Sequence, residues 1–225
     1  MQLVILAAGN GKRMGNLTKN IPKPMLTLKG KPILEHKMNI LPADITEIIM
    51  IVGYRREQIM KHFGNSHNGR KIIYVLQNRL NGSGGALHLA KSLLRDKFLV
   101  MMGDDLYHKK DIRKMMKHEL AVLGHKSGNP SAAAIRTNHR GHLVDIIEKP
   151  KKNEERIENT ALYTLTKKFF EYDLVSIGNG EFGLPQTLAA MARDHKVKVE
   201  RATLWHKINS VEEFQKAEEI LHKFI

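Results

Sequence analysis

The feature that most constrains this chain lies near its N-terminus, where an apolar run leads directly into a turn of small residues. Residues 3–6 read LVIL, a run typical of a strand that is buried on both faces of a mostly parallel sheet. Residues 7–11 read AAGNG, and such small residues allow a sharp turn and a close approach of the backbone to a ligand. Backbone N–H groups in a turn of this kind point outward and can hold an anion.

Positive charge follows this turn at once. Lys12 and Arg13 come directly after Gly11, and Lys23 stands between two prolines that stiffen the backbone around it. A buried strand, a glycine turn and nearby cations together indicate a phosphate site. The spacing excludes the two better-known phosphate loops. No Gly-Lys-Ser/Thr tail follows the glycines, and Met14 stands where the dinucleotide fingerprint needs a third glycine.

The same stretch resembles the signature of the nucleotidyltransferases that act on sugar phosphates, L-A-A-G-x-G-x-R-M followed by K-P. Residues 6–14 match it at every defined position, and Lys23-Pro24 supplies the second part. The resemblance implies an α/β, Rossmann-like nucleotidyltransferase fold: a single domain with a central, mostly parallel mixed sheet and helices on both faces. It makes Arg13 and Lys23 catalytic cations. The nucleotide-binding residues that it implies here are Leu6, Ala8, Gly9, Gly11 and Arg13.

Length and charge agree with an enzyme for anionic substrates. At 225 residues the chain suits one sizeable α/β domain. It has 37 Lys and Arg against 23 Asp and Glu, and the net charge of +14 favours anionic partners. The basic residues are spread along the chain, no basic tail is present, and aromatic residues make up only 6%. A basic surface around a site for phosphate substrates is the simpler explanation, so we expect no nucleic acid partner.

Composition also excludes several other classes of protein. The absence of cysteine excludes disulfides, thiolate metal sites and a cysteine nucleophile. No apolar run approaches the ~20 residues that span a bilayer. The N-terminus lacks a basic region followed by an extended apolar core. We therefore expect a cytoplasmic protein without a membrane partner, and the sequence is compatible with a monomer or a homodimer.

Hydrophobic periodicity predicts strands that alternate with helices, as in a doubly wound sheet. The first part of the chain is expected to hold strands over residues 47–52, 71–76 and 98–102, helices over residues 31–41, 55–63, 82–94 and 111–120, and a loop over residues 124–130. The second part is expected to hold strands over residues 132–136, 143–147 and 160–165 and helices over residues 167–175 and 184–194. Ser210 and Glu213 form a capping box that opens a closing amphipathic helix.

We expect this one domain, residues 1–225, to have two functional halves. Residues 1–130 carry the phosphate turn and form the nucleotide-binding half, and residues 131–225 form the sugar-phosphate-binding half. A C-terminal domain of hexapeptide repeats, which some members of the family carry, is not expected.

Two aspartates follow the predicted strand over residues 98–102. Ligands gather at the carboxyl ends of strands in open α/β sheets, and a carboxylate there suits magnesium on a nucleotide's phosphates. The family resemblance places the metal on the first acidic residue after glycine in L-V-x-x-G-D, which is Asp104 here. Asp105 is better suited to capping a turn.

A glutamine and a glycine predict how the base is recognised. Members of the family that use UTP or dTTP contact the pyrimidine with a Gln side chain and with the backbone of a glycine five residues later. Gln77 and Gly82 have this spacing. A Gln amide can both donate to and accept from a uracil edge. The resemblance therefore favours a uracil or thymine base.

A third group of residues resembles the sugar-phosphate site of the family. Glu148-Lys149-Pro150 matches an E-K-P element, whose Glu bonds sugar hydroxyls and whose Lys meets the sugar's phosphate. Lys149 is thereby a catalytic cation as well. Residues 158–163 resemble the N-T-G-x-Y stretch of the family, which makes Asn159 a sugar contact. Ala161 stands where glycine is usual.

The segment from Trp205 to Ser210 resembles the family's second metal element with a change. Many members have W-x-D-x-G-T, with that Asp as the second ligand, and Lys207 occupies its position here. Uridylyltransferases for N-acetylglucosamine 1-phosphate place an Asn two residues later, which maps onto Asn209. We expect Asp104 and Asn209 to bind Mg²⁺. Lys207 either adds positive charge near the phosphates or points to solvent.

Taken together, the resemblance implies transfer of a nucleoside monophosphate from UTP or dTTP to a sugar 1-phosphate, with release of pyrophosphate. The attacking phosphate is already an anion, so the reaction needs alignment and countercharge from Mg²⁺ and the cations named above. Two alternatives stay open. One is a cytidylyltransferase for phosphocholine or another non-sugar phosphomonoester. The other is a nucleotide-sugar-binding regulatory protein that has lost turnover.

Overall fold

The computed structural model describes residues 1–127, 133–147 and 156–225. Its centre is a row of four parallel strands in the order β7 (Lys97–Met102), β1 (Gln2–Ala7), β4 (Glu47–Val52) and β6 (Arg70–Leu76). Every residue of β1 is buried because this strand has a parallel neighbour on each side and helices on both faces. The continuous apolar run at the N-terminus is therefore the middle of the sheet.

Antiparallel strands extend this sheet on the side of β7. The long strand β12 (Arg156–Thr166) pairs antiparallel with β7, which makes the sheet mixed. The further strands are β9 (Ala121–Ser127), β10 (Ala134–Thr137), β11 (Leu143–Ile147) and β15 (Lys198–Arg201), with β5 (Ser66–His67) at the opposite edge. Among the described residues, ten strands form this one sheet.

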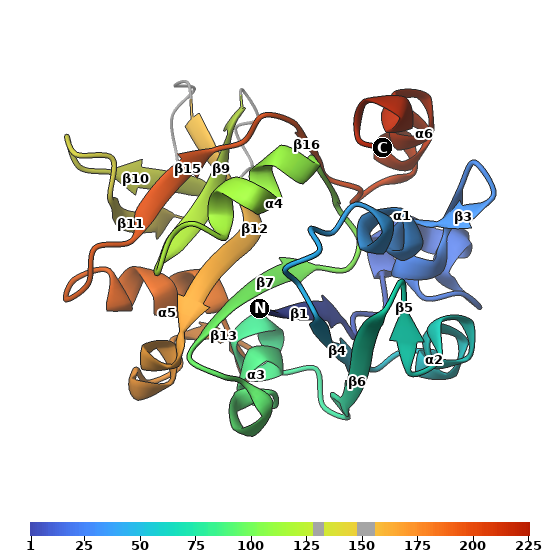
Figure 1. Cartoon of the computed structure of the whole chain (residues 1–225), viewed down its shortest axis with the longest axis horizontal. Helices are drawn as coiled ribbons and strands as arrows, with labels where there is room; N and C mark the ends of the chain where they lie inside the picture. The colour runs from blue at the N-terminus through green and yellow to red at the C-terminus, as the bar shows by residue number, and fades with distance from the viewer. Residues whose placement is uncertain (128–132, 148–155) are drawn as a thin grey trace.

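Helices cover both faces of the sheet (Figure 1). On β1, Val4 and Leu6 pack against one apolar cluster while Leu3 and Ile5 pack against the other. The first cluster includes α3 (Gly82–His88) and α5 (Leu184–Met191), and the second includes α1 (Ile33–Asn39), α2 (Arg56–Phe63) and α4 (Lys109–Met115). The predicted fold, a single α/β domain with a mostly parallel mixed sheet and helices on both faces, is confirmed.

A third apolar cluster joins the C-terminal helix α6 (Val211–Ile220) to the turn after β1. Met14 from the turn region, Ile33 from α1 and Ala217 from α6 are buried together in it. The Ser210 hydroxyl accepts from the Glu213 N–H at 3.2 Å, so the predicted cap is present. The short elements are β2 (Thr27–Leu28), β3 (Lys31–Pro32), β8 (Leu106–Tyr107), β13 (Ser176–Gly178), β14 (Glu181–Phe182), β16 (Trp205–His206) and the 3-10 helices η1 (Lys12–Thr18), η2 (Lys23–Met25), η3 (Lys91–Leu93), η4 (Lys167–Glu171) and η5 (Leu221–Lys223).

Some of the predicted elements were wrong. Residues 124–127 belong to β9 rather than to a loop. A Cβ at Gly124 would lie 2.2 Å from Cγ2 of Ile157, so this glycine permits the close pairing of β9 with β12. The strand β15 was not predicted, because Val199 is its only buried residue. Helices α3 and α4 end earlier than predicted, and η4 is a short 3-10 helix in place of a longer α-helix.

Within the ranges that the structure describes, no helix is both long enough and apolar enough to cross a lipid bilayer. This agrees with the composition of the chain.

Candidate functional site

A groove lies at the carboxyl ends of β1 and β7, where the order of the parallel strands reverses direction. It consists of three adjoining cavities of about 310, 550 and 220 Å³, which all share Leu6 and Met102 as lining residues. We call them the loop cavity, beside residues 9–13; the strand cavity, beside residues 158–163; and the helix cavity, beside α3. A ligand that follows the strand ends could therefore occupy all three at once.

The loop cavity is formed by the turn after β1. Gly11 has a φ of 63°, in the left-handed region, and a Cβ there would lie 3.0 Å from Thr18 Cγ2 and 3.1 Å from Lys23 Cβ. Only glycine fits this position without displacing its neighbours. Gly9 and Arg13 also line the cavity, and the Arg13 side chain is exposed to the ligand space.

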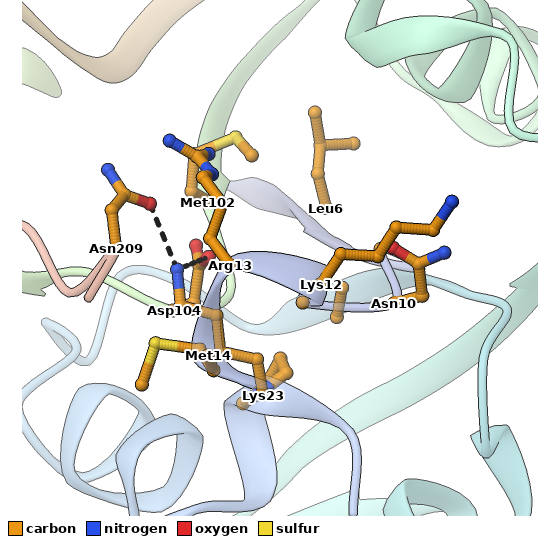
Figure 2. A pocket seen from close by; sticks show the side chains of 13 residues that line it. Leu6, Asn10, Lys12, Arg13, Met14, Lys23, Met102, Asp104 and Asn209 are labelled. Carbon is orange, nitrogen blue, oxygen red and sulfur yellow. Dashed lines mark hydrogen bonds and ion pairs between the residues drawn. The ribbon is translucent and has the colours of Figure 1, made fainter. Parts of the chain in front are cut away.

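Lys23 lies between the two predicted metal ligands, as Figure 2 shows. Its ammonium nitrogen is 2.5 Å from Asp104 Oδ2 and 3.1 Å from Asn209 Oδ1. The side chain of Lys23 is only 7% exposed, so its charge depends on these two oxygens. A carboxylate and an amide oxygen that converge on one cation are hard oxygen donors suited to Mg²⁺, and the lysine ammonium stands in for a cation there. The residues present therefore fit the metal.

The position between Asp104 and Asn209 has little negative charge of its own to hold a metal ion. Among the described residues, no group of three His, Cys, Asp or Glu side chains could hold a metal ion together. Asp104 supplies one formal negative charge and Asn209 supplies none. A metal here would take its remaining ligands from water and from the phosphates of a bound nucleotide.

Asp105, expected to cap a turn, has a different role. It is 7% exposed, and it accepts hydrogen bonds from Trp205 Nε1 at 3.3 Å and from the Ile208 N–H at 3.4 Å. Burial, and to a lesser extent the charge of the neighbouring Asp104, raise the pKa of Asp105 to about 7. The two contacts join the turn after β7 to the segment that carries Asn209.

The sequence reasoning also missed a buried cation, Lys37 of α1. Lys37 is 1% exposed, its ammonium donates to the carbonyl of Met102, and it lies 5.2 Å from the centre of the Tyr107 ring. Burial lowers the pKa of Lys37 to about 8, against the opposing attraction of Asp104 and Asp105. Ile33 lies four residues before Lys37, so helical spacing places Lys37 on the inward face, and this signal could have identified it.

Gln77 and Gly82 line the helix cavity, together with Leu6, Ala8 and Gly9. Gln77 is 6% exposed, and its amide nitrogen donates to Asn81 Oδ1 at 2.9 Å and to the Gly82 carbonyl at 3.4 Å. Both N–H donors are thus engaged within the protein. The amide oxygen is the group that Gln77 offers to a ligand.

The strand cavity contains Asn159, Glu158 and Lys207. The Lys207 ammonium lies 2.8 Å from Glu158 Oε1, and the two side chains are 21% and 9% exposed. Lys207 therefore neither points to solvent nor extends toward the loop cavity, and it is held by a partly buried ion pair. The amide of Asn159 donates to the Tyr163 hydroxyl at 2.8 Å.

Ala161 adopts a φ of 57°, the left-handed conformation that glycine takes without strain. Its N–H donates to Asn159 Oδ1 at 3.0 Å, within an irregularity of β12 between Asn159 and Tyr163. The backbone here thus has a conformation that favours glycine, although the residue is alanine.

Ala161→Gly should accordingly raise the free energy of unfolding by about 0.5–1 kcal/mol, because relief of left-handed strain exceeds the added entropy of the unfolded chain. The midpoint of thermal unfolding is expected to rise by roughly 2 °C. Ala202→Gly is the matched control: Ala202 is also partly buried but has no positive φ, so it should lose stability. Equal losses in both variants would show that the φ of Ala161 carries no strain.

The structure places every described site residue that the sequence predicted along this one groove. They are Leu6, Ala8, Gly9, Gly11, Arg13, Lys23, Gln77, Gly82, Asp104, Asn159 and Asn209. The predicted sugar-phosphate residues Glu148 and Lys149 lie outside the described residues. Glu158 and Glu213, which also line the strand cavity, were not predicted as site residues.

Comparison with known sequences gives a match over nearly the whole chain. The sequence model described as "Nucleotidyl transferase" matches residues 2–223. The "Bifunctional protein GlmU" of Methanococcus maripaludis is 32% identical over 214 residues, which are 92% of this chain and 51% of that protein. The "UTP--glucose-1-phosphate uridylyltransferase AglF" of Haloferax volcanii is 29% identical over 204 residues, 86% of this chain and 84% of that protein.

Solved structures agree in fold. A UDP-glucose pyrophosphorylase complexed with UDP-glucose superposes with a TM-score of 0.81 at 21% identity, covering 99% of this chain and 98% of that chain. The chain spans about half the length of the methanococcal relatives that it matches.

Proposed function

Because the chain belongs to the nucleotidyl transferase family, we propose that it transfers a nucleoside monophosphate from UTP or dTTP to a sugar 1-phosphate. The observation that carries this proposal is the continuous groove at the ends of β1 and β7. Its three cavities offer one place each to a base, a polyphosphate and an acceptor. The Haloferax volcanii relative is named for UTP and glucose 1-phosphate, which supports the same substrate classes.

The helix cavity is the proposed site of the base. Gln77 offers its amide oxygen, since its two N–H donors are bonded to Asn81 and Gly82. The N3–H of uracil or thymine is a donor and complements this oxygen, whereas N3 of cytosine is an acceptor. This polarity supports UTP or dTTP over CTP at the same position.

The loop cavity is the proposed site of the triphosphate. The turn after β1 presents backbone N–H groups and Arg13 to the phosphates. Lys23, which forms an ion pair with Asp104, lines the same cavity. We propose that Asp104 and Asn209 hold Mg²⁺, which when bound supplies positive charge to the phosphates and to the departing pyrophosphate. Arg13 and Lys23 supply the remaining countercharge that two anionic reactants require.

The strand cavity is the proposed site of the acceptor. Asn159 and the Glu158–Lys207 pair line it on the side of β12 and the Trp205–Asn209 segment. An acceptor phosphate placed there meets the α-phosphorus of a nucleotide in the loop cavity from the adjoining side of the groove. The chain's contribution is alignment and charge, because the attacking oxygen carries no proton that a base must remove. Lys149 keeps its proposed role at the acceptor phosphate.

The test is a panel of UTP, dTTP, CTP, ATP and GTP, each with Mg²⁺ and several sugar 1-phosphates or phosphocholine, in which pyrophosphate release is measured. We expect turnover with UTP or dTTP and a sugar 1-phosphate. Preference for CTP and phosphocholine would favour the cytidylyltransferase alternative. Binding of UTP without release of pyrophosphate for any pair would favour the regulatory protein.

Gln77→Ala should raise the KM for the preferred nucleotide about 10-fold or more, since a buried amide partner of the base is lost. The KM for the sugar phosphate should change little, because Gln77 lies in the helix cavity and not in the strand cavity. Asn78→Ala is the matched control, as Asn78 is an exposed amide one residue away. An equal effect on both substrates would remove Gln77 from base recognition.

A further inference from the structure

Asp105 is a buried carboxylate that the proposed chemistry does not use. It follows Asp104 directly, yet its oxygens accept hydrogen bonds from a segment about a hundred residues later in the chain. Oδ2 accepts from the Trp205 indole N–H at 3.3 Å, and Oδ1 accepts from the backbone N–H of Ile208 at 3.4 Å. Both donors belong to the segment that ends in Asn209.

This segment is held at both of its ends, by strand β8 at its start and by Asp105 near its end. Strand β16 pairs antiparallel with β8, placing Trp205 opposite Tyr107. After β16 the chain no longer pairs with β8. The hydrogen bond from the Ile208 N–H to Asp105 then connects the chain to the turn after β7. The next residue is Asn209, whose own N–H donates to Glu213 Oε2 at 2.6 Å. The backbone N–H groups of Ile208 and Asn209 are thus both anchored by carboxylates.

The other side of the turn is supported by Lys37. Its ammonium donates to the carbonyl of Met102, the last residue of β7, and lies over the ring of Tyr107 in β8. A buried cation and a buried carboxylate therefore flank the residues that lead to Asp104. Burial of two charged groups costs stability, and their hydrogen bonds offset part of that cost. Such an arrangement is expected where geometry matters for function.

We propose that Asp105 is a positioning residue that holds Asn209 opposite Asp104, so that their oxygens converge on one cation. The inference rests on the proposed function, because it assigns a role toward the metal that accompanies the nucleotide. Asp105 borders the strand cavity but is only 7% exposed, and its two carboxylate oxygens accept from Trp205 and Ile208. Its contribution passes through the Trp205–Ile208 backbone to the Asn209 side chain.

Asp105→Asn preserves the shape of the side chain but replaces one acceptor oxygen with a donor, so one of the two bonds must break. Loss of a partner that orients a metal ligand typically weakens metal binding about 10- to 100-fold. Binding of Mn²⁺ in the presence of UTP and without acceptor, measured by electron paramagnetic resonance, should weaken by that factor. The fluorescence of Trp205, the only tryptophan in the chain, should change because its N–H loses a carboxylate partner.

A double-mutant cycle with Asn209→Ala separates positioning from a general structural role. If Asp105 acts through Asn209, the double variant should bind Mn²⁺ no more weakly than Asn209→Ala alone. Additive losses would overturn the inference. Asp105→Ala gives a second variant for the same cycle, with binding measured on protein whose thermal unfolding shows it to be folded.

Asp111→Asn is the matched control. Asp111 is also a fully buried carboxylate, and it accepts from the backbone N–H groups of Thr203 and Leu204, just before Trp205. This variant is compared with wild type at equal folded fraction. Its Mn²⁺ affinity should stay within about twofold of wild type, because the contacts of Asp111 lie outside the Trp205–Asn209 segment. A loss equal to that of Asp105→Asn would show a non-specific effect of damage to this region and would overturn the inference.

The outcomes also distinguish the inference from the proposed function. If wild type binds no Mn²⁺ with UTP, or if Asn209→Ala binds it as tightly as wild type, the proposed metal site fails and the inference fails with it. If Asn209→Ala weakens binding and Asp105→Asn does not, the metal site stands and only the positioning role is overturned.

Discussion

Replacing Asp104 with asparagine is expected to lower kcat about 10²- to 10³-fold, because the groove loses its one formal negative charge at the proposed metal position. The amide oxygen of the variant can still accept from Lys23, whose ammonium lies 2.5 Å from Asp104 Oδ2. The fold should therefore survive, which the midpoint of thermal unfolding will check. Pyrophosphate release at saturating nucleotide and Mg²⁺ measures the loss.

Asp194→Asn is the control for this experiment. Asp194 is an exposed carboxylate that accepts from the Tyr172 hydroxyl, outside the groove, and its substitution removes the same charge. We expect wild-type turnover from it. Turnover of Asp104→Asn that equals wild type would remove Asp104 from the mechanism.

Lys23→Met is expected to have opposite effects on turnover and on metal binding without nucleotide. Turnover should fall about 10²- to 10³-fold, because a cation that faces the phosphates is lost. Binding of Mn²⁺ alone should become about 10- to 100-fold tighter, because the metal no longer displaces the ammonium from Asp104, a charged hydrogen bond worth about 1.5–3 kcal/mol. If the lysine only stabilised the loop, its removal would not tighten the binding of a metal.

Lys12→Met is the matched control, since Lys12 is an exposed lysine that also lines the loop cavity. Its substitution makes the same change in charge, but no ammonium is removed from Asp104. Mn²⁺ binding without nucleotide should then stay close to that of wild type. Weaker Mn²⁺ binding in Lys23→Met would contradict the exchange of lysine for metal at this position.

Much of the fold could be predicted because its strongest signals are local. Residues 3–6 of β1, residues 48–52 of β4 and residues 98–102 of β7 are apolar at every position, as is typical of strands at the middle of a sheet. The glycine turn and its cations adjoin β1 in sequence, so their spacing alone indicated a phosphate site. Elements whose burial depends on distant partners, such as β15 and the end of β9, lacked such a signal.

Site residues could be predicted where a single residue has a role by its own position in the sequence. They were harder to predict where the role depends on a contact between two distant residues. Gln77 and Asp104 follow strands, and the ends of parallel strands meet at one edge of a sheet. The pairing of Lys207 with Glu158 joins residues 49 positions apart, and that of Asp105 with Ile208 joins residues 103 apart. Nothing in the sequence links the two partners of either pair. The sequence therefore left two roles open for Lys207 and led to the wrong role for Asp105.

The most direct test of the central claim follows the α-phosphorus of the nucleotide. UTP and dTTP that carry a radioactive α-phosphorus are each incubated with the protein, Mg²⁺ and the sugar 1-phosphate that releases most pyrophosphate. We predict that the label of the preferred nucleotide is recovered in a nucleotide sugar, with one pyrophosphate formed per labelled product, and that omission of the sugar phosphate stops both. Label recovered as the nucleoside monophosphate at the same rate without an acceptor, or retained entirely in the triphosphate with both nucleotides, would contradict this mechanism.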